Sequence, residues 1–142
     1  VCRRLAEDGR DVLVAGLDRT GLSAFLATLL RHAAAAAPFP AAMASGVATA
    51  LSTNLVNNLP AGLVAGQAVQ AADAPGLVSA AILIGIDLGP NLSVTGSLAT
   101  ILWLAALRRE ALPVRPGTFL TLGVQVMPPS LVLALLTLLA TR

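Results

Sequence analysis

Two short polar segments interrupt long apolar stretches of this sequence. The first, 52-STNLVNNLPAG-62, contains three asparagines, a serine and a threonine, and the second, 87-DLGPNLSVTGS-97, contains an aspartate, an asparagine and three hydroxyl side chains. Amide groups both donate and accept hydrogen bonds, and hydroxyl groups can do either. Such a mixed set suits a small, oxygen-rich and weakly charged solute, so we predict that the two segments form a binding site.

The candidate binding residues come from both segments. Their spacing of i, i+3 and i+4 puts Asn54, Asn57 and Asn58 on one helical face if the helix reaches Asn58. In the second segment, Asn91 and Thr95 pair at i, i+4. The predicted solute-binding residues are Thr53, Asn54, Asn57, Asn58, Asn91, Ser93 and Thr95.

Asp87 is the one ionisable residue between positions 74 and 107. A carboxylate inside a membrane is a functional candidate, either as a proton carrier or as the partner of a cation. We predict that Asp87 couples transport to protons. The alternative is a role like that of a helix cap beside Gly89 and Pro90, or a position near one membrane surface.

A structural explanation competes with the binding site. Serine, threonine and asparagine often hold transmembrane helices together, each hydrogen bond contributing roughly 0.6–2 kcal/mol. Small residues such as Ser93, Gly96 and Thr100 also permit close packing. Two polar clusters with matching interruptions favour a site over packing alone.

The composition indicates that lipid surrounds the chain. Hydrophobic residues make up 56% of its 142 residues and charged residues 11%, against about 25% charged in soluble domains. Because polar unpaired groups are costly in lipid, we predict an all-α, polytopic membrane protein with transmembrane helices and broken or re-entrant helical hairpins. Nine arginines form no long basic run with aromatics, which excludes nucleic acid as a partner.

The sequence offers little chemistry besides binding. Cys2 is the single cysteine and His32 the single histidine. There is therefore no disulfide framework and no CxxC metal site, and no nucleophile lies with a base and an orienting group. We predict that the chain is not an enzyme and takes no metal and no cofactor.

Helix lengths explain where the chain must turn. About 20 apolar residues cross a bilayer, and residues 33–72 form an uncharged block twice that long. The block must turn back, and Asn57 to Pro60 is its only strong break. A helix is also predicted from Thr20, with an apolar face. That face comprises Leu22, Phe25, Leu26, Leu29 and Leu30.

The chain divides into a short N-terminal segment and a transmembrane region. We predict a truncated or aberrant segment at 1–19 and a C-terminal transmembrane transport region at 20–142. Within that region lie a hairpin or break at 52–62, a break at 87–97 and a last helix at 117–141. Pro128 and Pro129 are expected to kink or break the last helix.

Prolines place the starts of two half-helices. Proline is favoured in the first turn of a helix, so one half-helix is predicted to begin at Pro60 and another at Pro90. Half-helix N-termini at the bilayer midplane present free N–H groups, the layout of a transporter site.

The loop 108–116 has three arginines against one glutamate, which predicts a cytoplasmic loop and an outward C-terminus.

Several segments resemble one family of transporters. They are 16-GLDRTGL-22, 52-STNLVNNLPAGL-63, 83-LIGIDLGPNLSVTGSLATILWL-104 with 107-LRRE-110, and 127-MPP-129. Over residues 12–141 the chain resembles the C-terminal part of the arsenite and antimonite efflux permeases, the arsenical pump membrane proteins of the ion transporter superfamily. Family members are much longer than this chain.

The resemblance implies a secondary transporter built from inverted repeats with re-entrant hairpins, in the cell inner membrane. It would export arsenite or antimonite and confer arsenical resistance, using the proton gradient or a separate ATPase subunit as partner. By motif position, one polar loop of the site would hold Asn54, Asn57 and Asn58. The other loop would hold Asp87, Asn91, Ser93 and Thr95.

Two other functions remain open at this stage. One is an inactive membrane fragment that associates with other subunits through faces of small residues. The other is a sodium-coupled transporter of small anions or dicarboxylates from the same superfamily. Sodium dependence of transport would distinguish this last possibility from an arsenite exporter.

Overall fold

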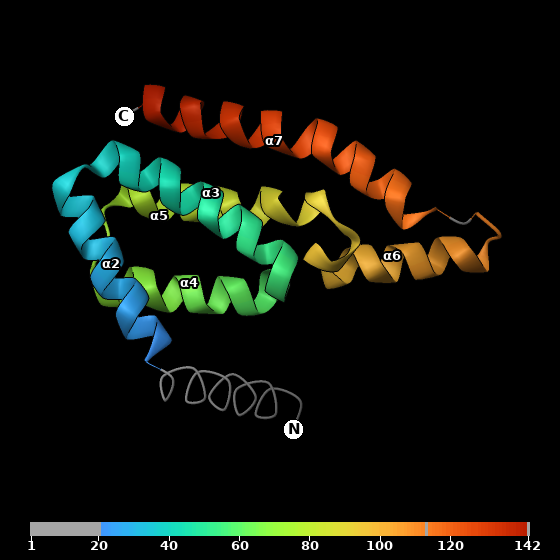
Figure 1. The fold of residues 1–142 in the computed structure, drawn as a ribbon, viewed down its shortest axis with the longest axis horizontal. Coiled ribbons are helices and arrows are strands. Elements are labelled where there is room, and N and C mark those ends of the chain that lie inside the picture. The colour runs from blue at the N-terminus through green and yellow to red at the C-terminus, as the bar shows by residue number, and fades with distance from the viewer. Residues whose placement is uncertain (1–20, 113, 142) are drawn as a thin grey trace.

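The structure is a computed structural model that describes residues 21–112 and 114–141 (Figure 1). The described residues form six α-helices and two short 3₁₀ helices, with no strand among them. This confirms the predicted all-α fold, while the predicted N-terminal segment 1–19 lies outside the described residues. The elements are α2 (Leu22–Ala36), α3 (Pro38–Val56), α4 (Asn58–Ala72), α5 (Gly76–Leu88), η1 (Gly89–Leu92), η2 (Val94–Gly96), α6 (Leu98–Arg109) and α7 (Pro116–Ala140).

The helices form a hairpin, an interrupted helix and a returning helix. Helices α3 and α4 are the two arms of the hairpin, and α5 packs along α3 (Figure 1). After η1 and η2, α6 continues in the direction of α5, away from the hairpin (Figure 1). Helix α7 then returns along the molecule and contacts η1 and α5. The turn of the hairpin therefore lies beside the interruption between α5 and α6.

Small residues allow α3 and α5 to approach closely. A Cβ atom added to Gly46 of α3 would lie 2.9 Å from the carbonyl oxygen of Ala81, and one added to Gly85 of α5 would clash with the carbonyl oxygen of Gly46. Ala50 is fully buried in the same contact. Packing through residues four positions apart is typical of helix pairs in membranes. This contact fixes the hairpin against the interrupted helix.

The large apolar side chains lie mainly on the outside. Helix α2 begins at Leu22, two residues after the predicted start. Its predicted apolar face is divided: Leu22, Phe25 (66% exposed) and Leu29 are exposed, whereas Leu26 and Leu30 are half-buried. The buried face of α2 consists of Ser23, Ala27 and Ala34. Contiguous apolar surface of this kind is rare on monomeric proteins in water. This arrangement is that of a helical membrane protein.

Among the described residues, α7 is the helix that is both long and apolar enough to cross a bilayer. Shorter apolar helices cover Leu22–Ala36 and Gly76–Leu92. The sequence predicted a kink or break at Pro128 and Pro129. Helix α7 is continuous through both prolines and curves along its length (Figure 1), so the helix does not break there.

The block 33–72 contains two interruptions, although the sequence predicted one strong break. The additional interruption is Ala37, which has extended backbone angles (φ −158°, ψ 93°) between α2 and α3. Pro38 follows at the start of α3. A proline disfavours the helical conformation of the residue before it. Pro38 therefore keeps Ala37 out of the helix, and α2 ends at Ala36. The prediction overlooked this effect of Pro38.

Helix α2 is tied to the second arm of the hairpin. The Ser23 hydroxyl donates to the Gln67 side-chain oxygen at 3.0 Å. The Arg31 guanidinium donates to the carbonyl oxygen of Ala71 at 2.6 Å, in the last turn of α4. Carbonyls in a last helical turn lack partners within the helix, so Arg31 satisfies one of them.

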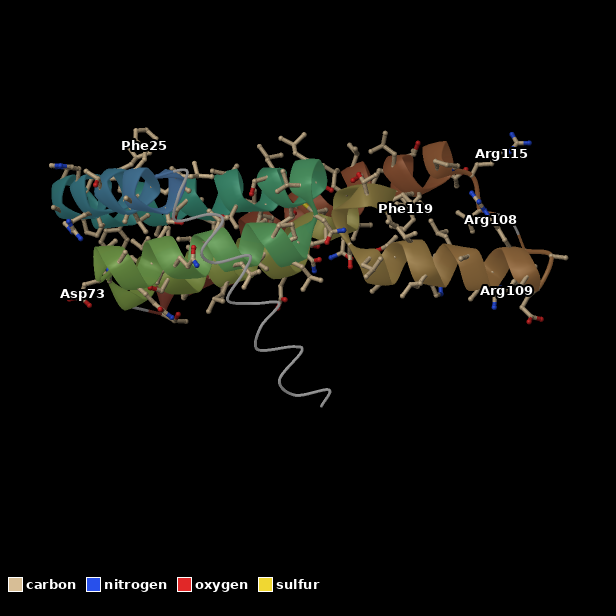
Figure 2. All side chains as sticks on the ribbon, turned by 90° about the horizontal axis from the view of Figure 1, so that it is seen from below. Phe25, Asp73, Arg108, Arg109, Arg115 and Phe119 are labelled. Carbon is tan, nitrogen blue, oxygen red and sulfur yellow. The ribbon has the colours of Figure 1, made fainter. Side chains whose placement is uncertain are left out.

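Charged side chains gather at the two ends of the long axis. Figure 2 shows Asp73 at one end, after α4, and Arg108, Arg109 and Arg115 at the opposite end, around the connection from α6 to α7. The hairpin turn and the interruption of α5 and α6 lie between these ends (Figure 1). Such a distribution leaves a mainly apolar band between two charged edges, as a bilayer requires, with Asp87 as the ionisable side chain beside the second interruption.

Candidate functional site

A single residue makes the hairpin turn between α3 and α4. Asn57 has φ 72° and ψ 155°, a region of backbone conformation that residues other than glycine rarely adopt and that costs about 1–3 kcal/mol. Its side-chain oxygen accepts a hydrogen bond from the backbone N–H of Leu59 at 3.4 Å. The chain thus turns at Asn57, within the segment Asn57 to Pro60 where the turn was predicted, and Pro60 lies in the first turn of α4.

The three asparagines do not share a helical face as predicted. Helix α3 ends at Val56, and the positive φ of Asn57 redirects the chain before Asn58 begins α4. Asn54 therefore belongs to one arm of the hairpin and Asn58 to the other. A shared face at i, i+3 and i+4 requires an uninterrupted helix up to Asn58, and the turn at Asn57 interrupts it.

The second interruption changes the helical conformation over nine residues without reversing the chain. Helix α5 ends at Leu88, the 3₁₀ helices η1 and η2 follow, and Ser93 between them is extended (φ −137°, ψ 160°). Helix α6 begins at Leu98, where Ser97 accepts a hydrogen bond from the N–H of Ala99 at 3.2 Å. The predicted start of this half-helix at Pro90 is wrong.

The local reason is that Pro90 begins a 3₁₀ helix that ends at the extended residue Ser93. A serine at the N-cap can satisfy a free N–H of the first turn, and Ser97 does so for α6. Because residues 93–97 are not α-helical, the predicted i, i+4 pairing of Asn91 with Thr95 does not occur.

Hydrogen bonds join the hairpin turn directly to the second interruption. The side-chain nitrogen of Asn54 donates to the carbonyl oxygens of Ala50 and Gly89, both at 2.9 Å. The Ser93 hydroxyl donates to the side-chain oxygen of Asn54 at 2.8 Å. The Thr95 hydroxyl donates to the backbone oxygen of Asn54 at 3.2 Å. We call this network the polar junction.

Asn57 adds a second amide to the polar junction. Its side-chain nitrogen donates to the carbonyl oxygen of Thr95 at 3.3 Å. The hydroxyls of Ser93 and Thr95 lie 3.1 Å apart and share a hydrogen bond. The junction thus brings together four of the predicted site residues, from two segments about forty positions apart: Asn54, Asn57, Ser93 and Thr95.

Glycines make this close approach possible. A Cβ atom added to Gly89 would lie 2.5 Å from the Cα atom of Ala50 and 2.6 Å from the Thr53 hydroxyl. One added to Gly96 would lie 2.9 Å from the side-chain oxygen of Asn54. Gly96 was predicted as a packing residue, whereas the packing role of Gly89 was not predicted. Its four-residue spacing from Gly85 is a signal of close packing that could have revealed it.

The remaining predicted residues lie around the junction without joining it. Thr53 is fully buried and its hydroxyl donates to the carbonyl oxygen of Ala50 at 2.8 Å. Asn91 is exposed, and its side-chain nitrogen donates to the carbonyl oxygens of Leu88 and Asp87 at 3.1 and 3.3 Å. Asn91 therefore satisfies carbonyls at the end of α5.

Asn58 and Asp87 differ from the other predicted residues. Asn58 is half-buried at the start of α4, and Asp87 is exposed near the end of α5. Within residues 21–112 and 114–141, neither side chain makes a hydrogen bond or an ion pair. Their polar groups are therefore free to contact a solute or an ion.

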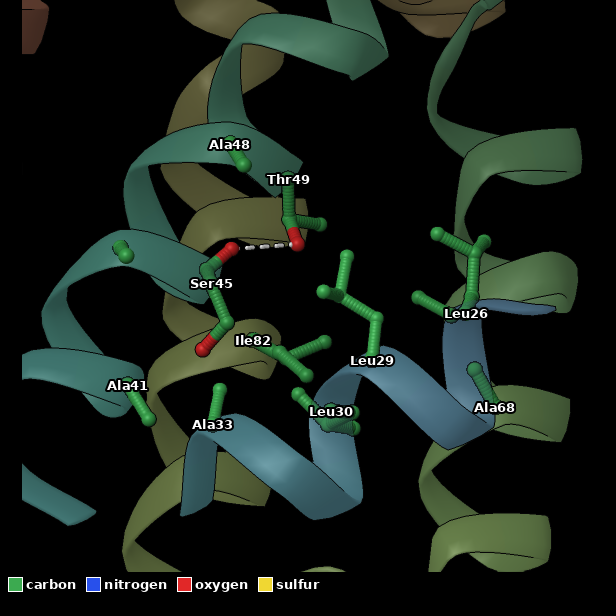
Figure 3. A pocket seen from close by; sticks show the side chains of 12 residues that line it. Leu26, Leu29, Leu30, Ala33, Ala41, Ser45, Ala48, Thr49, Ala68 and Ile82 are labelled. Atoms are coloured by element: carbon green, nitrogen blue, oxygen red, sulfur yellow. Dashed lines mark hydrogen bonds between the residues drawn. The ribbon is translucent and has the colours of Figure 1, made fainter. Parts of the chain in front are cut away.

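An apolar groove of about 360 Å³ between α2, α3 and α4 is the alternative place for a ligand. Figure 3 shows Leu26, Leu29 and Leu30 of α2 facing it. Its two hydroxyls are already paired, since Ser45 donates to the carbonyl oxygen of Ala42 at 3.1 Å and Thr49 to that of Ser45 at 2.7 Å. The groove therefore lacks free donors for an oxygen-rich solute. Asn58, directly after the hairpin turn, and Asp87, two residues before Gly89, have free polar groups within the described residues.

The fold and the junction define an all-α membrane protein whose helices are interrupted at polar segments inside an apolar band. Discontinuous helices of this kind are typical of secondary transporters. Among the residues that the structure describes, no group of three or more histidine, cysteine, aspartate or glutamate side chains could hold a metal ion.

Comparison with known proteins assigns the chain to a family. The model of the arsenical pump membrane protein family matches residues 5–141. Arsenical pump membrane proteins of Escherichia coli, of Escherichia coli strain K12 and of Shigella flexneri are each 31% identical to it over 134 residues. No solved structure matches the chain significantly. The chain belongs to the arsenical pump membrane protein family, as the sequence motifs predicted.

The matches cover 92% of this chain and 31% of each relative. The chain thus spans about a third of the length of the curated relatives it matches.

Proposed function

We propose that this protein is a multi-pass transporter that exports arsenite or antimonite across the cell inner membrane, and that the surroundings of the polar junction form its solute site. The observation that carries the proposal is the junction itself, in a chain of the arsenical pump membrane protein family. Two interruptions meet there. Asn58 directly follows the hairpin turn and Asp87 lies two residues before Gly89, and within the described residues neither side chain makes a hydrogen bond or an ion pair.

The chemistry of the solute agrees with these side chains. Trivalent arsenic in neutral water is mainly a small uncharged hydroxide, which offers hydroxyl groups and oxygen lone pairs. The amide of Asn58 can donate to and accept from such a solute. The exposed residues Asn91 and Thr95 at the second interruption add an amide oxygen and a hydroxyl that can accept a hydrogen bond. An uncharged solute needs no cluster of basic side chains.

The helix ends add a favourable field. Asn58 is the first residue of α4 and Leu98 the first of α6, so two helix N-termini begin at the interruptions. Free N–H groups at a helix N-terminus carry a partial positive charge and attract oxygen atoms. The site therefore combines neutral hydrogen-bonding groups with two helix N-termini.

For energy coupling we propose Asp87 as the proton carrier. Its carboxylate is the one acidic side chain of α5, and it lies one residue before the helix ends. An intramembrane carboxylate can carry a proton across the apolar region. An ATPase subunit is the alternative source of energy, and it requires a partner protein that binds the complete transporter.

The charge distribution suggests an orientation. The connection from α6 to α7 carries Arg108, Arg109 and Arg115 at one end of the molecule (Figure 2). We propose that this end faces the cytoplasm and that α7 runs outward from it.

The test is energised uptake of arsenite into everted membrane vesicles. Two proteins are compared: this 142-residue chain and a form of it extended upstream to the length of the family, called here the extended form. We expect the extended form to take up arsenite when a proton gradient is imposed. Uptake that requires sodium would replace proton coupling by sodium coupling, and uptake that requires a co-expressed ATPase would replace the proton gradient as the source of energy.

Comparing the two proteins also tests the alternative that this chain is an inactive membrane fragment. Uptake by the extended form alone identifies the substrate and shows that the 142 residues are insufficient. Uptake by both shows that this part suffices. If both forms are inserted and neither takes up arsenite or antimonite, the proposed function is wrong.

A further inference from the structure

We infer that Asn54 is a positioning residue that holds the hairpin turn against the second interruption, and that Asn58 supplies the hairpin amide that reaches the solute. The part of this inference that concerns Asn58 and the solute rests on the proposed function. The sequence placed Asn54 and Asn58 together as equivalent solute ligands, and their surroundings divide them into two roles.

The hydrogen-bonding capacity of Asn54 is already used within the protein. An asparagine amide has two N–H donors and one oxygen acceptor with two lone pairs. Both donors bind carbonyl oxygens, those of Ala50 and Gly89, and the oxygen accepts from Ser93. The backbone of Gly96 packs against that same oxygen, because a Cβ atom there would lie 2.9 Å away. No N–H donor of Asn54 is left for a solute.

The partners of Asn54 explain what the amide holds together. Ala50 lies one turn before Asn54 on α3, whereas Gly89 and Ser93 belong to the second interruption. Gly89 lies where α5 ends, and carbonyls at a helix end need partners outside the helix. One side chain thus bonds a helix end and a loop hydroxyl at once, which fixes both relative to α3.

Asn58 has the opposite character. It is half-buried at the first position of α4, on the far side of the turn from Asn54. Its amide makes no hydrogen bond within the described residues, so both N–H donors and the oxygen remain free. The exposed carboxylate of Asp87 is equally unengaged.

The first experiment measures the junction without transport. Asn54→Ala, Ser93→Ala and the double variant are made in the extended form, and Tm is measured in detergent. Residues that share a hydrogen bond are not additive. We expect the double variant to lower Tm by clearly less than the sum of the single variants. Ser52→Ala is the matched control, since the Ser52 hydroxyl bonds only the carbonyl of Thr49 in its own helix, and it should be additive with Asn54→Ala.

The second experiment separates positioning from solute binding. We expect Asn54→Ala to lower the maximal rate of arsenite uptake severalfold with KM changed less than about twofold. This is the result expected when fewer of the protein molecules have the conformation that can transport, while those that have it bind the solute normally. Asn58→Ala should raise KM about tenfold while leaving Tm unchanged. Ser93→Thr keeps the hydroxyl and should retain the wild-type rate, and Ser93→Ala should not. If Asn54→Ala does not insert, these two Ser93 variants decide the role of the junction.

Two results would overturn the inference. One is additivity of the Asn54 and Ser93 variants in Tm, and the other is an increase in KM for Asn54→Ala as large as that for Asn58→Ala. Absence of arsenite uptake in the unmodified extended form would instead reject the proposed function. The Tm comparison would still decide whether Asn54 joins the two interruptions.

Discussion

The two polar interruptions contain similar residues and adopt different geometries. The first reverses the chain at one residue, Asn57, which has a strained positive φ. The second extends from Gly89 to Ser97, uses two 3₁₀ helices and keeps the direction of the chain (Figure 1). The comparison shows that polar composition marks where a membrane helix is interrupted, whereas backbone geometry at single residues decides whether the chain turns back.

The two interruptions also carry complementary hydrogen-bonding groups that bond to each other. The hairpin turn supplies amides, and the second interruption supplies a carbonyl oxygen and hydroxyls that bind them. Neither segment could satisfy its polar groups alone inside an apolar band, where each unpaired group is costly. Pairing one interruption with the other satisfies polar groups of both, and within the described residues it leaves Asn58 and Asp87 unpaired.

The largest effect is expected from Asp87, the one carboxylate of α5, which lies just before the second interruption. Asp87→Asn removes the proposed proton carrier while keeping the size and polarity of the side chain. We expect proton-driven arsenite uptake by the extended form to fall at least about tenfold, with normal insertion into the membrane. Uptake in everted vesicles checks this, and a normal rate in Asp87→Asn would remove Asp87 from the mechanism.

A glycine substitution tests how closely the two interruptions must approach. In Gly89→Ala the new Cβ atom would lie 2.5 Å from the Cα atom of Ala50, so α3 and α5 would have to separate. We expect the free energy of unfolding to fall by about 1–3 kcal/mol. Gly66→Ala on α4 is the matched control, because its Cβ atom meets open space, and it should gain up to about 1 kcal/mol. Equal effects of the two substitutions in detergent unfolding would contradict the close contact.

The strained turn can be tested at Asn57. Asn57→Ala keeps a Cβ atom in an unfavourable conformation and removes the hydrogen bonds to Leu59 and Thr95, so we expect a loss of about 1–3 kcal/mol in stability. Asn57→Gly loses the same bonds but relieves the strain, and it should be more stable than Asn57→Ala. Thermal unfolding of the two variants checks the order. If the alanine variant is the more stable one, Asn57 is not strained.

The smallest effect is expected away from both interruptions. Ser23→Ala removes the hydrogen bond to Gln67 that ties α2 to α4. We expect a loss of about 0.5–1.5 kcal/mol in stability with arsenite uptake unchanged. Thr28→Ala, whose hydroxyl bonds only Ala24 in its own helix, should change stability by less than about 0.5 kcal/mol. A large loss of uptake in Ser23→Ala would extend the functional region to α2.

Much of the fold could be predicted from the sequence. Composition and block lengths gave the all-helical class, the turn at Asn57 to Pro60 and the interruption after Asp87, because the number of apolar residues limits what a helix can span. Block lengths could not reveal that α2 ends at Ala36, before Pro38, or that α6 begins only at Leu98. Both boundaries depend on the local backbone of one or two residues.

The site was predicted as a set of residues but not as an arrangement. Periodicity placed Asn54 and Asn58 on one helical face, because it cannot reveal that Asn57 reverses the chain. The contact between Asn54 and Ser93 joins residues 39 positions apart, and no local pattern encodes such a pairing. Which amides are used within the protein, and which remain free, emerges only when both segments are seen together.

The central claim is that arsenite binds beside the polar junction through Asn58. Its most direct test is the Tm of the purified extended form with and without arsenite, because a ligand that binds the folded state raises Tm. We predict that arsenite raises the Tm of the unmodified protein and of Ser52→Ala, and that the increase is lost in Asn58→Ala. An equal increase in Asn58→Ala, or no increase in the unmodified protein at saturating arsenite, would contradict the account.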